Sequence, residues 1–115
     1  AIGENVSELT TEDAKSKFAT AFAGLLHELR QHGNPTVFVR SSFWSNPTKD
    51  SIMQTTARDA GVAFVDIATL GSDESNMARS ERQIEHAGVA AHPGDKGMKA
   101  IADAIFTAIR KESEN

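Results

Sequence analysis

The spacing of apolar residues predicts three amphipathic helices. Apolar side chains recur every three or four residues between Thr11 and Gly33, and again over residues 49–60 and 95–111, which gives each segment one apolar face. Thr10 or Thr11 is the expected N-cap of the first helix, and Gly33-Asn34-Pro35 is a typical helix end. The apolar faces comprise Ala14, Phe18, Phe22, Leu25 and Leu29; Ile52, Met53, Thr56, Ala57 and Ala60; and Met98, Ile101, Ala102, Ile105, Phe106 and Ile109.

Two short strands are expected between these helices, over residues 36–41 and 62–67. Both runs are rich in β-branched and aromatic residues, and the second is almost continuously apolar, as in a strand covered on both faces. Alternation of helices and strands predicts the α/β class with a parallel sheet. Two strands cannot cover both faces and both edges of a sheet. We therefore expect residues 1–5 to be the end of a third strand, and the sheet to continue outside these residues.

Length and composition narrow the function classes. A chain of 115 residues predicts a single domain, and a net charge of −4 disfavours nucleic acid as a partner. No apolar run approaches the roughly 20 residues that span a bilayer, so no membrane span is expected. The absence of cysteine excludes thiolate chemistry but leaves the cellular compartment open.

Two motifs lie near the two ends of this pattern. Gly3 and Asn5 form a Gly-x-Asn motif, and His92-Pro93 is followed by Gly97-Met98 at the start of the last helix. In this order, within an alternating α/β chain, they resemble the third and fifth blocks of the SGNH (GDSL-like) hydrolase superfamily. The resemblance runs from the third block to the C-terminus.

This resemblance implies a three-layer, flavodoxin-like parallel sheet flanked by helices, of which residues 1–115 form the C-terminal part. It implies a serine esterase or acetylesterase that acts on a small-molecule or carbohydrate ester without metal or cofactor. His92 would be the general base and Asn5 an oxyanion donor, with Gly3 beside the substrate.

The chain departs from the family pattern in three places. The Gly-Asp-Ser nucleophile block and the second block are absent, so we expect the nucleophile outside this chain and no activity from the chain alone. Val89 stands where the family has an aspartate three residues before its histidine. Glu85, His86 or Asp95 could orient His92 instead, or the site could work as a Ser-His dyad. Val6 replaces the aspartate that often follows the asparagine.

Other readings of the same residues remain open. His92 could be a capping residue and Asn5 an ordinary turn residue. Phe43 and Trp44 follow the carboxyl end of the first expected strand, where α/β proteins bind ligands. They would either contact substrate or cover the hydrophobic core. The spacing of His86 and His92 fits no known zinc signature, so no metal site is expected.

A second function hypothesis is a non-catalytic α/β module that associates through open sheet edges. The edges of residues 36–41 and 1–5 would recruit a second copy or the missing N-terminal half.

Overall fold

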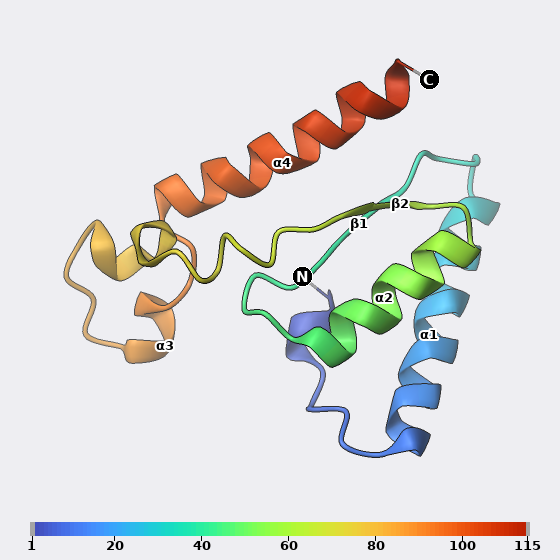
Figure 1. Cartoon of the computed structure of the whole chain (residues 1–115), viewed down its shortest axis with the longest axis horizontal. Helices are drawn as coiled ribbons and strands as arrows, with labels where there is room; N and C mark the ends of the chain where they lie inside the picture. The colour runs from blue at the N-terminus through green and yellow to red at the C-terminus, as the bar shows by residue number, and fades with distance from the viewer. Residues whose placement is uncertain (1, 115) are drawn as a thin grey trace. The chain divides into compact units, whose positions relative to one another are not determined.

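The computed structural model describes residues 2–114, which form two compact units (Figure 1). Of these residues, the first unit comprises 2–42 and 46–66, and the second comprises 43–45 and 67–114. The single domain expected from chain length stays a prediction.

The first long helix of the first unit begins and ends close to the predicted positions. α1 spans Glu12–Gln31, and the Thr11 side chain caps it by accepting a hydrogen bond from the Ala14 amide at 3.1 Å. Beyond the helix, Gly33 and Asn34 both have positive φ, at 81° and 50°. Glycine and asparagine adopt this conformation at the least cost, which explains why the helix stops here.

The two expected strands are confirmed as a parallel pair, each shorter than predicted. β1 (Phe38–Arg40) pairs with β2 (Ala63–Val65), and Val39 lies opposite Phe64. α2 (Pro47–Asp59) connects them, and the Asn46 side chain caps it by accepting from the Lys49 amide at 3.1 Å. The α/β class is therefore confirmed.

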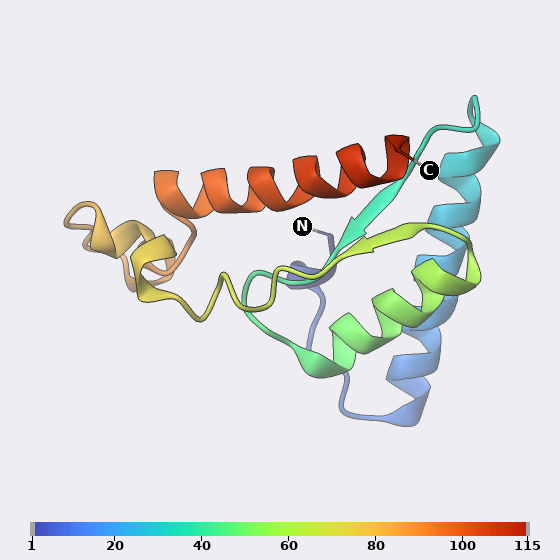
Figure 2. The same cartoon turned by 45° about the horizontal axis from the view of Figure 1, so that its top comes forward.

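Both helices of this unit pack on one side of the strands (Figures 1 and 2). The hydrophobic core between them contains side chains from α1, α2, β1 and the residue before β2. They are Phe22, Leu26, Val39, Met53, Ala57 and Val62. This arrangement gives the unit a helical layer and a sheet layer. A third layer, as in a flavodoxin-like fold, stays a prediction.

The prediction of a strand at residues 1–5 is wrong for the described residues. Ile2–Asn5 form a short 3-10 helix, η1, and the Val6 amide donates to the Gly3 carbonyl at 3.3 Å. Glycine and asparagine disfavour strands, and a strand here would need a neighbour to satisfy its backbone groups. Ala1 lies outside the described residues.

The second unit contains the long loop and the last helix. Residues 71–94 contain the 3-10 helices η2 (Glu74–Asn76) and η3 (Ala78–Ser80) and the short helix α3 (Ala87–Ala90). α4 spans Asp95–Ser113, close to the predicted range. Across residues 2–114, no helix is both long enough and apolar enough to cross a bilayer.

Candidate active site

The turn that carries His92 is held by backbone hydrogen bonds. The His92 carbonyl accepts from the Ala78 amide at 2.8 Å, and the His92 amide donates to the Val89 carbonyl at 3.1 Å. Two residues later, the Gly94 amide donates to the Asn76 carbonyl at 2.9 Å. Met77 and Pro93 form an antiparallel bridge between these contacts. The backbone of His92 is thus fixed by the 76–78 segment, whereas the residue itself is exposed.

Asn76 is the buried centre of this arrangement. It is 3% exposed, and its side-chain amide donates to the Leu70 carbonyl at 3.0 Å. A Cβ atom built on Gly97 would lie 2.2 Å from the Asn76 carbonyl oxygen, so only glycine lets α4 approach this closely. The sequence places Asn76 in a polar loop, and no local signal reveals that it is buried.

Glu81 caps the helix that follows His92. Its two carboxylate oxygens accept from the Asp95 and Lys96 amides, each at 2.8 Å. These hydrogen bonds, above all the one from the Lys96 amide, hold the pKa of Glu81 below its usual value. A carboxylate suits this position because the first amides of a helix lack acceptors and carry partial positive charge. Since Glu81 lies 14 residues before the helix in the chain, the sequence did not reveal it.

Trp44 lies beside His92 in the same unit. The two rings have centroids 4.7 Å apart and are nearly perpendicular, at 86°. The indole N–H donates to the Ala91 carbonyl at 3.1 Å. Phe43 contacts Trp44 in an edge-to-face arrangement, with centroids 5.8 Å apart. Trp44 is 37% exposed and Phe43 only 1%, so Trp44 has ring surface open to a ligand whereas Phe43 is buried; a substrate role for either stays a prediction.

Two of the three residues suggested as orienting groups for His92, His86 and Asp95, have other partners. The His86 ring accepts from the Val89 amide at 3.3 Å and caps α3, and Asp95 lies 3.6 Å from Arg82. Within the described residues, no carboxylate is found within hydrogen-bond distance of the His92 ring. Nor does this part of the chain contain a group of three His, Cys, Asp or Glu residues that could hold a metal ion.

Gly3 and Asn5 belong to the first unit. Gly3 is buried, and a Cβ atom there would lie 3.2 Å from the Met53 sulfur, whereas Asn5 is exposed on η1. Because His92 belongs to the second unit, the pairing of Asn5 with His92 in one site stays a prediction.

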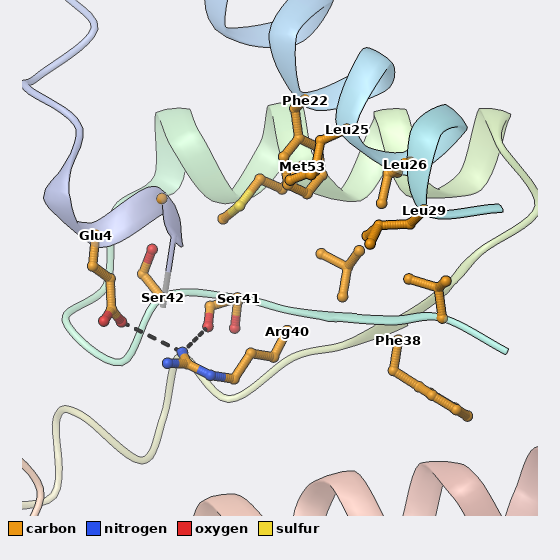
Figure 3. Close-up of a pocket in the computed structure, with 13 residues that line it drawn as sticks. Glu4, Phe22, Leu25, Leu26, Leu29, Phe38, Arg40, Ser41, Ser42 and Met53 are labelled. Atoms are coloured by element: carbon orange, nitrogen blue, oxygen red, sulfur yellow. Dashed lines mark hydrogen bonds and ion pairs between the residues drawn. The ribbon is translucent and has the colours of Figure 1, made fainter. Parts of the chain in front are cut away.

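A groove of about 210 Å³ lies between α1 and β1 in the first unit (Figure 3). Its polar end contains Arg40, whose guanidinium donates to the Ser41 carbonyl at 2.8 Å and lies 3.4 Å from the Glu4 carboxylate. The Ser42 hydroxyl is buried at this end and has no hydrogen-bond partner among the described residues. The remaining wall is mainly apolar and includes Phe22, Leu25, Leu26, Leu29, Val37, Val39 and Met53.

Comparisons of the chain with protein-family models, with curated proteins and with solved structures found no match.

Proposed function

We propose that this chain supplies the general base and an oxyanion donor of an SGNH-type ester hydrolase with a three-layer, flavodoxin-like fold. The observation that supports this most directly is the construction of the His92 turn. Backbone hydrogen bonds on both sides hold the residue at the start of α4 and leave it exposed. A base that must meet an external nucleophile needs this combination of a fixed backbone and an accessible ring.

In the proposed reaction, a serine outside this chain attacks the ester carbonyl while the His92 imidazole takes its hydroxyl proton. The tetrahedral intermediate carries a negative oxygen, to which the Asn5 side-chain amide donates a hydrogen bond. Collapse breaks the bond to the alcohol, and His92 returns the proton to the departing oxygen. Water then hydrolyses the acyl-enzyme with His92 again as the base. The expected substrate is a short-chain ester, including O-acetylated carbohydrate, because the exposed Trp44 ring suits a sugar face.

Reconstitution tests this proposal. The chain alone is expected to give no turnover of p-nitrophenyl acetate, and a mixture with an N-terminal SGNH segment that carries the Gly-Asp-Ser block is expected to give it. His92→Ala should abolish this turnover, and Asn5→Ala should lower kcat by about 10²–10³-fold. His86→Ala is the matched control, because His86 is also an exposed histidine of the second unit but caps α3. Turnover by the chain alone that depends on His92 would refute an external nucleophile.

A second candidate function is association through the open edge of β1. The sheet of the described residues has two strands, so β1 has a neighbour only on the β2 side. The Ser41 amide donates to the Val65 carbonyl of β2 at 2.9 Å. Because successive amides of a strand point to opposite sides, the Phe38 and Arg40 amides point away from β2, to the open edge. The apolar groove beside this edge favours an added strand.

Light scattering coupled to size-exclusion chromatography tests the association. Pairing of two β1 edges predicts a dimer, which Phe38→Pro should dissociate because proline removes an edge donor. Thr36→Pro is the control, because Thr36 lies before β1. Ala63 cannot serve as the control position, since it pairs with β1. A monomer at all concentrations would count against edge pairing between copies.

A further inference from the structure

Among the described residues, the His92 ring has no carboxylate partner of the kind that usually orients a catalytic histidine. A general base of this kind is commonly held by a carboxylate on its second ring nitrogen. Here Val89 lies three residues before His92 and is 51% exposed, and Asp95 is near Arg82 instead. The backbone hydrogen bonds fix the His92 main chain but leave rotation about its side-chain bonds free. Some other group must limit that rotation if His92 is to meet a nucleophile in one orientation.

We propose that Trp44 is the positioning residue for His92. The indole and imidazole rings are 4.7 Å apart and perpendicular, within the range of favourable aromatic pairs. The indole is itself fixed relative to the His92 backbone, because its N–H donates to the carbonyl of the preceding residue, Ala91. One side chain therefore binds the main chain next to His92 and packs against the His92 ring.

The chain at Trp44 is also tightly packed. Phe43, its neighbour in the chain, is almost fully buried and packs edge-to-face against the indole. A Cβ atom built on Gly71 would lie 1.6 Å from the Phe43 carbonyl oxygen, so Gly71 packs directly against the Phe43 main chain. Trp44 is thus a preorganised support, and its role in catalysis rests on the proposed function, whereas its contact with His92 does not.

Nuclear magnetic resonance of the isolated chain tests the contact without any need for activity. We expect cross-relaxation between the indole protons and the carbon-bound imidazole protons of His92, whose signals are assigned by their loss in His92→Gln. The indole ring current should displace these signals from those of the other three histidines. Trp44→Ala should remove the displacement, and Trp44→Phe should retain part of it because a ring remains while the hydrogen bond to Ala91 is lost.

Two results would overturn the proposal. One is the absence of indole–imidazole cross-relaxation in the unmodified chain, a measurement that does not depend on whether a Trp44 variant folds. The other is an unchanged His92 signal in a folded Trp44→Ala variant. Neither result bears on whether His92 acts as a base, which the reconstitution with the Gly-Asp-Ser segment decides separately.

Kinetics of the reconstituted hydrolase then separate positioning from substrate binding. With p-nitrophenyl acetate, which has no sugar to stack on the indole, Trp44→Ala should lower kcat by about 10–100-fold with little change in KM, since a misdirected base slows the chemical step. Trp44→Phe should recover part of the loss. A raised KM with unchanged kcat would instead make Trp44 a substrate contact and would refute the positioning role.

Discussion

Replacing Gly97 by alanine tests the packing that supports the His92 turn. The added methyl carbon would lie 2.2 Å from the Asn76 carbonyl oxygen and 3.0 Å from the Pro93 Cβ atom. Ordinary contact begins near 3.4 Å, so α4 and the Asn76 backbone would have to separate by about 1.2 Å. The same carbonyl accepts the Gly94 amide, so this movement would also weaken the hydrogen bond after His92.

Two opposing effects determine the size of the change. Alanine stabilises a helix by about 1 kcal/mol relative to glycine. Overpacking of this kind costs about 1–3 kcal/mol, and loss of the hydrogen bond to Gly94 costs about 1 kcal/mol more. We therefore expect Gly97→Ala to lower the free energy of unfolding by about 1–3 kcal/mol.

Gly24→Ala is the matched control. Gly24 lies in the middle of α1, and a Cβ atom there has no neighbour within 4 Å. Only the higher helix propensity of alanine acts at this site, so Gly24→Ala should be more stable than the unmodified chain by about 0.5–1 kcal/mol.

Urea denaturation measures both variants. Far-ultraviolet circular dichroism follows the helices, and the fluorescence of Trp44, the single tryptophan, reports on the unit that contains Gly97. Equal stability of Gly97→Ala and the unmodified chain would show that α4 does not pack against the Asn76 carbonyl.

Four further predictions concern the caps and the buried polar groups. Because the pKa of Glu81 is lowered in the folded state, its stabilising effect is present above the unfolded-state pKa of about 4.3 and is lost as pH falls through the folded value. The difference in urea midpoint between the unmodified chain and Glu81→Gln should therefore shrink below pH 4, and a constant difference would contradict this. Thr11→Ala should lower the unfolding free energy by about 1 kcal/mol through loss of the α1 cap, measured by thermal denaturation against Thr10→Ala, which leaves the cap intact. Asn76→Ala should cost about 1 kcal/mol, because the Leu70 carbonyl loses the shorter of its two hydrogen bonds and keeps the one from the Asp73 amide at 3.3 Å, and should reduce amide protection at Gly94 in hydrogen exchange. Ser42→Ala should be neutral or stabilising by about 1 kcal/mol, since it removes a buried hydroxyl without a partner among the described residues, and a clear loss of stability would contradict that assignment.

The parts of the fold that could be predicted are those set by local sequence. Thr11 followed by two acidic residues specifies a helix start, and Gly33 and Asn34 accept the positive φ values that end it. The strands were located by their β-branched residues, and their parallel pairing follows from the connecting helix. These features depend on neighbours within a few positions.

Contacts between distant positions explain what the sequence did not reveal. Glu81 caps a helix that begins 14 residues later, and the burial of Asn76 depends on a glycine in that same helix. No periodicity records such contacts. The strand expected at residues 1–5 failed for a related reason, because a strand requires a neighbour that local sequence does not specify. Of the candidate site, the position of His92 at the start of the last helix was predicted, whereas its contact with Trp44 was not.

Hydrogen bonds between main-chain atoms, rather than side-chain contacts, hold most of the His92 turn. This determines which of the surrounding positions can vary. Ala78 and Asn76 hold the turn through an amide and a carbonyl that any residue except proline would supply in full. Exposed side chains along 74–80 could therefore be exchanged without moving His92. Gly97, by contrast, accepts a larger residue only if α4 and the Asn76 backbone move apart. A library randomised over this region should accordingly tolerate changes at the exposed positions and reject them at the glycine.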